Sequence, residues 1–326
     1  MKFLQKYWLI LVLAIIATVL LFFWIQGRNS SAPADEVLDA TLPKIPYPEI
    51  GGQEIPAGAS VSINAFPNAS EAVVYQVTPI AFNHQQALSA AQSLGFPEQP
   101  SSINNDVVFG SYYLWMTESQ TLTIRLSPVD VAISSDVLNL NTGQEFPDDS
   151  AAVNFINDIV GKIGVNTTGL RFIQTASRTV FNDQVKEVGL VPVVEGVPVV
   201  DINPTAPMVL GRFKEDGSLF GFSYRSGFSS PQSALRYKIK TEGEMKSSLF
   251  NEGKIMVLGD PQEAPRVLTP SVVNIEKIIN SLLFYPQKPT ILFPIFVLEG
   301  KAQTGDGEVP IVIYMPSVKS DYLEGR

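Results

Sequence analysis

Carboxylates are the side chains of this sequence best suited to acid–base chemistry. Asp148, Asp149 and Asp158 lie close together in the chain. A pair of carboxylates held at a fixed separation can hydrolyse a glycosidic bond. Asp148 and Asp149, however, stand where a helix is predicted to begin, and acidic residues there stabilise its free N–H groups and its dipole. We therefore expect helix capping from these residues, and a carboxylate-based hydrolase is an alternative reading.

The chain contains one histidine and no cysteine. Zinc sites built from Cys and His ligands are therefore excluded, and so is nucleophilic catalysis by a Cys–His pair. A Ser-His-Asp triad would have to use His84. His84 follows Asn83, which fits an N-cap, and Gln86 fits the third position of a capping box. This pattern predicts that His84 is an exposed residue in the first turn of a helix.

Asp306 and Glu308 are candidates for a calcium site, because carboxylate oxygens are the ligands that calcium prefers. The spacing of an EF-hand is missing, and an Asp-Gly pair is typical of a hairpin turn without any metal. The sequence also contains no glycine-rich phosphate loop and no Gly-x-Ser-x-Gly nucleophile motif. We predict no catalytic residue, no metal site, no cofactor and no enzymatic activity.

An aromatic run offers the one candidate binding surface. Tyr112, Tyr113 and Trp115 would line a groove for a peptide or a glycan if their rings faced solvent. Aromatic residues are also typical of strands, where alternate side chains are buried against a neighbouring helix. The second interpretation is favoured.

These residues are placed by a predicted series of helices and strands. Helix signals open at Asn83, Asp148 and Thr241, each followed by an apolar stripe or a capping box. Alternating or β-branched runs predict strands at 73–77, 107–116, 121–126, 129–133, 170–175, 188–194, 197–201, 209–214, 219–224, 292–298 and 309–314. Residues 272–285 fit both a helical stripe and an alternating strand, so periodicity does not assign them.

The order of these elements predicts an α+β fold, with an N-terminal transmembrane helix followed by two units that each pack a helix on an antiparallel sheet. We expect a membrane anchor with a short cytoplasmic tip in residues 1–27 and a Pro/Gly-rich linker in residues 28–60. The first α+β unit is expected in residues 61–140 and the second in residues 141–326.

The predicted anchor is the run from Tyr7 to Ile25, which has no charge and one polar side chain, Thr18. As a helix the run spans roughly 28 Å, close to the thickness of a bilayer's hydrocarbon core. Lys2 and Lys6 precede it, which places the N-terminus in the cytoplasm and the rest of the chain outside. A cleaved signal peptide is the alternative, but the run is longer than a typical signal core.

Overall charge limits the partners. The net charge of −9 argues against nucleic acid, whose binders present clustered Lys and Arg. It also argues against broad electrostatic attraction to anionic lipids. We expect contact with membrane lipid through residues 7–25, and contact with another membrane protein.

Several stretches of the second predicted unit carry a resemblance to a known family. They are Glu195-Gly196-Val197-Pro198-Val199, Phe213-Lys214-Glu215-Asp216-Gly217-Ser218-Leu219, Tyr237–Gly253, Leu292–Gly300 and Tyr314–Val318. They resemble the YycH/YycI-type extracytoplasmic regulators of a cell-wall-sensing histidine kinase and the related PepSY-like domains. The resemblance implies a membrane helix followed by a folded exterior, action through protein contacts, and a strand at 272–285.

Together these features predict an interaction or regulatory module, anchored in a bacterial cell membrane with the bulk of the chain outside. Such a module would serve as an accessory of a sensor kinase or of an envelope complex. The alternatives are an extracytoplasmic peptide- or glycan-binding domain and, second, the carboxylate-based hydrolase.

Overall fold

The computed structural model describes residues 42–324, apart from gaps at 65, 68, 107–109, 136–144, 166–170, 181–183, 205–206, 226, 230, 260–267 and 286–289. The predicted membrane helix at residues 7–25 and the predicted boundary between residues 140 and 141 lie outside the described residues. Within the described part, no helix is both long enough and apolar enough to cross a bilayer.

Three α-helices of the described structure begin at the side chains predicted to cap them. They are α2 (His84–Ser93), α3 (Asp149–Ile163) and α4 (Glu242–Glu252). Asn83 and Thr241 each form a complete capping box, and the Asp148 carboxylate accepts a 2.7 Å hydrogen bond from the Ala151 backbone N–H. These bonds satisfy donors that a helix cannot pair within itself, and they confirm the predicted starts of the helices.

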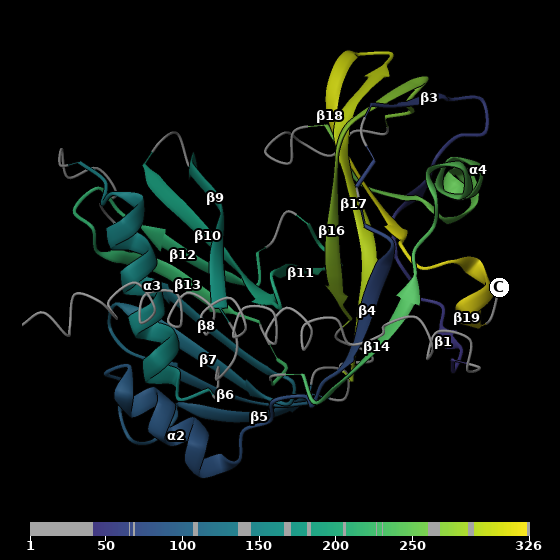
Figure 1. The fold of residues 1–326 in the computed structure, drawn as a ribbon. Coiled ribbons are helices and arrows are strands. Elements are labelled where there is room, and N and C mark those ends of the chain that lie inside the picture. Colours follow the sequence, from purple (N-terminus) through teal and green to yellow (C-terminus); the bar gives the residue numbers. More distant parts are fainter. Residues whose placement is uncertain are drawn as a thin grey trace, which may run out of the picture. The chain divides into compact units, whose positions relative to one another are not determined.

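The first sheet, called sheet I, is antiparallel and is crossed by α2 and α3 on one face (Figure 1). In spatial order its strands are β5 (Ser102–Asp106), β6 (Gly110–Met116), β7 (Gln120–Leu126), β8 (Val129–Ser135), β13 (Leu219–Tyr224), β12 (Val209–Phe213), β10 (Val185–Val194) and β9 (Arg171–Val180). Trp115, Leu122 and Val188 pack with Ile156 of α3 in the core beneath the helices. We call this the helix face of sheet I.

The second sheet, sheet II, is mainly antiparallel. Its strands in spatial order are β2 (Gln53–Glu54), β15 (Lys254–Leu258), β18 (Gly307–Pro316), β17 (Ile291–Thr304) and β16 (Val272–Phe284). Three further strands extend it: β3 (Ser60–Ile63) runs parallel to β16, and β4 (Glu71–Gln76) pairs with both β17 and β14 (Ser233–Lys238). Phe296, Leu298 and Ile313 pack with Leu249 of α4, which defines the helix face of sheet II.

One strand joins the two sheets. β11 (Val197–Asp201) pairs antiparallel with β10 of sheet I and parallel with β16 of sheet II. The turn that leads into it has positive φ at Glu195 (48°) and Gly196 (87°), the conformation of a two-residue hairpin turn. β11 therefore leaves sheet I by a tight turn and continues into sheet II, between the labelled β10 and β16 in Figure 1.

The predicted α+β fold class is wrong. Strands make up 52% and helices 16% of the described structure, so the protein is mostly β. The two predicted sheet-plus-helix units are also not separate, because sheet I pairs β8 from the first with β13 from the second. Local periodicity identified most strands, but strand pairing over 80 or more residues leaves no local signature, as Ile133 opposite Phe222 shows.

The structure also describes part of the predicted linker and the segment that periodicity did not assign. Folded structure begins inside the predicted linker, where Ile45, Ile50 and Ile55 are buried and β1 (Ile45–Pro46) pairs with β19 (Leu323–Glu324) near the end of the chain. Residues 272–284 form the long strand β16. A bulge between Ile275 and Lys277 shifts the register of that strand, so its alternation changes phase part-way along, and this explains why periodicity did not separate a strand from a helix.

Candidate functional site

A cleft of about 650 Å³ lies between the faces of the two sheets that carry no helix. Side chains of a strand alternate between its two faces, so each sheet can bury one set of residues under helices and present the other set to the cleft. In β10, Val188 and Leu190 belong to the core with α3, whereas Gly189 and Val191 line the cleft. The volume falls within the range of pockets that bind small molecules and short peptides.

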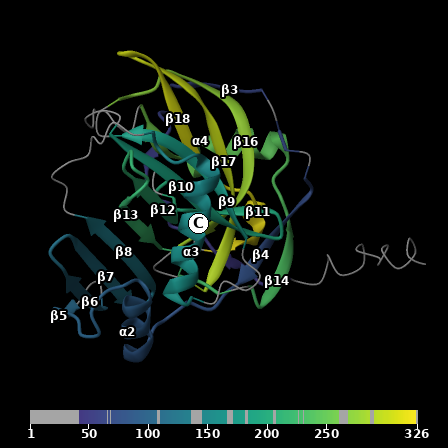
Figure 2. The same cartoon turned by 90° about the vertical axis from the view of Figure 1, so that its left-hand side faces the viewer.

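Both sheets and the strand that joins them supply the lining (Figure 2 shows β10 and β17 from a second side). Sheet I contributes Ile173, Gln174, Arg178, Glu187, Gly189, Val191 and Leu210, and β11 contributes Pro198, Val200 and Asp201. Sheet II and the loop beyond β15 contribute Val257, Gly259, Lys277, Ile279, Ser281, Val297, Glu299, Pro310, Val312 and Tyr314, and the segment after β11 adds Asn203, Pro204 and Pro207. Most of this surface is aliphatic.

On the sheet I side, a buried carboxylate is held by two arginines. The Glu187 oxygens accept hydrogen bonds from Arg178 at 2.9 Å and from Arg212 at 2.8 Å. Burial raises the pKa of the Glu187 carboxyl, but these two hydrogen bonds outweigh burial and leave the pKa below its usual range. Glu187 is therefore ionised and fully engaged, which suits a structural anchor for the wall of the cleft.

On the sheet II side, Lys277 and Glu299 form an ion pair at 3.3 Å, and both side chains are largely exposed. An exposed pair of this kind contributes little to stability. It does neutralise both charges within the cleft.

Asp201 differs from the other charged residues of the cleft. It is the last residue of β11, and it is only 8% exposed. The Asn203 backbone N–H donates to it at 3.2 Å. Burial raises the pKa of the Asp201 carboxyl above its ordinary value, against the effects of that hydrogen bond and of the positive charge of Arg225. Among the described residues, no Lys or Arg side chain forms an ion pair with Asp201.

Tyr314 is the aromatic residue of the cleft lining, and it is 1% exposed. Burial, followed by the negative charges of Asp201 and Glu299, raises the pKa of its hydroxyl. The hydroxyl is therefore protonated at neutral pH and is available as a hydrogen-bond donor.

The aromatic run, for which burial in a strand was the favoured interpretation and a groove the other, lies outside the cleft. Tyr113 and Trp115 are 6% and 0% exposed and belong to the core beneath α2, whereas Tyr112 lies on the opposite face of β6 and is half-buried. None of the three lines the cleft. Because Trp115 is fully enclosed, its ring has no surface to offer a ligand, and the alternation of β6 separates Tyr112 from its two neighbours.

The other sequence candidates are also outside the cleft. His84 is exposed at the start of α2, where its Nδ1 lies 2.8 Å from the Tyr113 hydroxyl. Asp149 bonds to Lys186, Gln174 and Ser177, and these bonds lower the pKa of its carboxyl to about 2.

Asp158 pairs with Lys162 on the surface of α3, and Glu308 pairs with Lys301 at the β17–β18 hairpin. The Asp306 backbone N–H donates to the Thr304 hydroxyl within the same turn. Within the described residues, no group of three or more His, Cys, Asp or Glu side chains is arranged to hold a metal ion.

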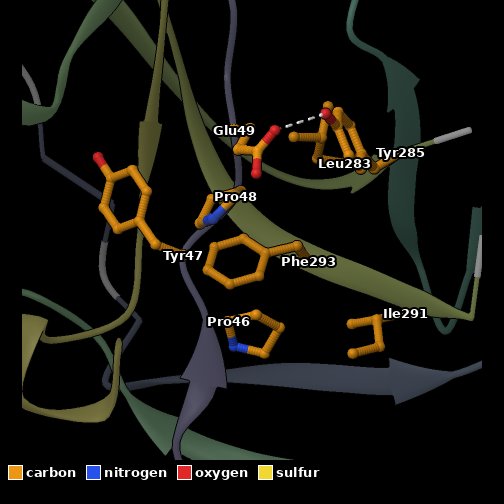
Figure 3. A pocket seen from close by; sticks show the side chains of 8 residues that line it. All are labelled: Pro46, Tyr47, Pro48, Glu49, Leu283, Tyr285, Ile291 and Phe293. Atoms are coloured by element: carbon orange, nitrogen blue, oxygen red, sulfur yellow. Dashed lines mark hydrogen bonds between the residues drawn. The ribbon is translucent and has the colours of Figure 1, made fainter. Parts of the chain in front are cut away.

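A second recess is much smaller. It measures about 40 Å³ and is lined by Pro46, Tyr47, Pro48, Glu49, Leu283, Tyr285, Ile291 and Phe293 (Figure 3). The Tyr285 hydroxyl donates to the Glu49 carboxylate across one side of it at 3.4 Å. This volume holds no more than a water or two, so it offers no binding site for a larger ligand.

Comparison with known proteins adds little. No protein-family model matches the chain, and no curated protein matches it. One similar solved structure is that of an uncharacterized protein from Eubacterium rectale ATCC 33656. It is 10% identical, with a TM-score of 0.43 over 78% of this chain and 87% of that chain. A likeness this weak supports no statement about this protein.

Sequence reasoning missed the cleft and Asp201. One signal was present: in Val309–Tyr314 both faces of the strand are apolar, although a sheet with one solvent face alternates apolar and polar residues. An apolar second face indicates that it is covered by, or faces, another apolar surface. The partner of that face could not be read from the sequence, because β18 and β10 are separated by more than 100 residues.

Proposed function

We propose that this protein is an extracytoplasmic interaction or regulatory module that binds an extended peptide segment in the cleft between sheets I and II. The cleft itself is the observation that supports this proposal. It has a volume suited to a few residues of a peptide, and its walls come from both sheets. A segment bound there would contact sheet I, sheet II and β11 together.

The lining favours a peptide over a glycan. Carbohydrate sites offer exposed aromatic rings to sugar faces, but Tyr314, the aromatic residue among the described lining residues, is almost fully buried. Aliphatic residues and prolines dominate instead, and the Ser281 hydroxyl is a group that suits hydrogen bonding to a peptide backbone. In addition, β9 is the last strand of sheet I in the described structure, and such an edge strand can accept another strand.

Membrane attachment is part of the proposal and rests on the sequence. Residues 7–25 have the length and apolar character of a membrane helix, and the flanking charges orient the folded part outward. A module held at the surface in this way meets the exposed loops and tails of other membrane proteins. Those segments are the peptides we propose for the cleft.

A hydrolase is the second candidate, and Asp201 favours it. A buried carboxyl with a raised pKa can serve as a general acid. Peptides would be incubated with the protein and then recovered. Recovery of intact peptides alone would support binding without hydrolysis, whereas cleavage products formed by the wild type but not by Asp201→Asn would support hydrolysis.

Blocking the cleft tests the proposed binding. Ile279 is half-buried at the cleft face of β16, so Ile279→Trp places a larger ring in the space for the ligand. The full chain in lipid nanodiscs would be incubated with a library of acetylated hexapeptides built from Val, Leu, Pro, Gln, Lys and Glu. We expect the wild type to capture peptides, and Ile279→Trp to capture about tenfold fewer, as measured by mass spectrometry against empty discs.

Leu235→Trp is the matched control, because Leu235 is an aliphatic strand residue, 39% exposed, that does not line the cleft. Its capture should equal that of the wild type. Equal capture by Ile279→Trp, or no capture by the wild type, would contradict the proposed function.

A further inference from the structure

The charges that line the cleft do not cancel. Arg178 pairs with Glu187 at 2.8 Å, and Lys277 pairs with Glu299 at 3.3 Å. Of the described charged residues in the lining, this leaves Asp201 without an ion-pair partner. The cleft therefore carries one carboxylate whose charge is not neutralised by an ion pair among the described residues.

Burial makes the charge of Asp201 energetically costly. Asp201 is more than nine-tenths buried, is the last residue of β11 and lines the cleft. Arg225 is close enough to attract it but also acts on Asp130, which in turn is repelled by Asp201. Arg125 forms the ion pair of Asp130, at 3.8 Å. Among the described residues no Lys or Arg forms an ion pair with Asp201, so a cation from outside would stabilise this buried carboxylate.

The cleft that Asp201 lines also has apolar walls. Val200, Leu210 and Tyr314 line the same cleft. Tyr314 stays neutral and adds no charge of its own, since burial and its acidic neighbours raise its pKa. The recess is therefore complementary to a chain that carries one positive group and otherwise apolar side chains.

We propose that Asp201 selects peptides with a basic side chain, whose ammonium or guanidinium group pairs with its carboxylate while aliphatic neighbours pack on the cleft walls. This inference rests on the proposed function of the cleft. It adds a chemical class of ligand, a peptide with a single Lys or Arg among apolar residues. Lys and Arg share the chemistry and differ in geometry, since only Arg can form two parallel bonds to one carboxylate.

The composition of captured peptides tests this inference separately from capture itself. The hexapeptide library is extended with Arg and with norleucine, which has the length of lysine without its charge. With the wild-type full chain in nanodiscs, we expect Lys and Arg to be enriched about tenfold over norleucine among captured peptides. Asp201→Asn keeps the size of the side chain and should remove that enrichment while capture continues. An excess of Arg over Lys would identify bidentate pairing within the same proposal.

The controls keep the two proposals apart. Glu98→Gln removes one negative charge from an exposed residue outside the cleft and should leave the enrichment unchanged. Capture without enrichment of basic residues, or an enrichment that persists in Asp201→Asn, would overturn the selection by Asp201 but leave the binding cleft intact. A wild type that captures nothing would overturn both.

The pH dependence gives a second readout on the same samples. Arg225, Asp130 and Tyr314 are the charged and titratable groups that interact with Asp201. Burial raises the pKa of the Asp201 carboxyl, against the backbone N–H groups of Asn203 and Ile202 and the positive charge of Arg225. The carboxylate is present above that pKa and is lost as the pH falls through it. The preference for Lys over norleucine should therefore decline at a pH above the ordinary aspartate range in the wild type and be flat in Asp201→Asn. A preference unaffected by pH in the wild type would also overturn the proposal.

Discussion

Replacing Lys240 by methionine should lower the free energy of unfolding by about 3–5 kcal/mol, measured by denaturant unfolding of the full chain. Lys240 is 1% exposed and its Nζ lies 3.0 Å from the Glu252 carboxylate, which is completely buried. The same ammonium group donates to the backbone carbonyls of Pro316 and Val318. Its three N–H groups therefore have three acceptors, and methionine would leave the buried Glu252 charge with the Ser320 hydroxyl as a donor but without its positive partner.

A matched control is available on α4, the helix that ends at Glu252. Lys246 forms an exposed ion pair with Glu242, with both side chains about half exposed, so Lys246→Met should cost no more than about 0.5 kcal/mol. The double variant Lys240→Met/Glu252→Leu removes both buried charges and should recover part of the lost stability, although the two carbonyls still lose their donor. A loss in Lys240→Met no larger than in Lys246→Met would contradict this account of the buried pair.

The second large effect is expected at Gly300, where replacement by alanine should cost about 3 kcal/mol of stability. Gly300 lies in the central strand β17 opposite the bulge of β16. An added Cβ would approach the Asn274 carbonyl oxygen to 2.0 Å and the Ile275 Cα to 3.0 Å. Both obstacles are backbone atoms, so the clash is relieved only by moving β16, the strand that supplies Lys277 and Ile279 to the cleft.

Gly305→Ala provides the comparison, because no atom lies within 4 Å of a Cβ built at that hairpin position. Its effect on the midpoint of thermal unfolding should be close to zero. Equal stability of Gly300→Ala and Gly305→Ala would show that the bulge does not approach β17 as closely as described.

The parts of the fold that depend on neighbours in sequence were predictable. The caps at Asn83, Asp148 and Thr241 follow from hydrogen bonds between residues three apart, and such short-range chemistry is visible in any single sequence. The strands next to the Asp216-Gly217 turn were predictable for the same reason, because that pair favours a hairpin.

The pairing of distant segments was not predictable. β11 joins β16, and in doing so places Val200 opposite Leu283, more than 80 residues along the chain. Local preference does not distinguish this partner from any other apolar strand. The cleft exists only because of such pairings, so Asp201, an ordinary acidic residue after a strand in the sequence, gained its significance from the structure alone.

The aromatic run at Tyr112, Tyr113 and Trp115 is a case where local pattern was informative. Tyr113 and Trp115 were conspicuous in the sequence, yet their size and apolar surface place them in the core beneath α2. Large aromatic residues dominate cores for the same reason that they dominate binding sites, namely the area that they bury. The burial of Tyr113 and Trp115 agrees with the favoured interpretation of this run as a strand with one buried face.

The most direct test of the account is the reactivity of single cysteines, because the natural chain has none. Ile279→Cys lies at the cleft face of β16, and Leu298→Cys lies on the adjacent strand but at the helix face, where Leu298 is 0% exposed. Leu235→Cys is an exposed reference. Each variant would be treated with a membrane-impermeant maleimide in right-side-out membrane vesicles, with and without captured peptide. We predict that the cysteines at positions 235 and 279 react, that the cysteine at position 298 does not, and that bound peptide protects position 279 alone. If the cysteine at position 279 is as unreactive as that at position 298, or if peptide does not protect it, the result would contradict an open cleft that binds peptides.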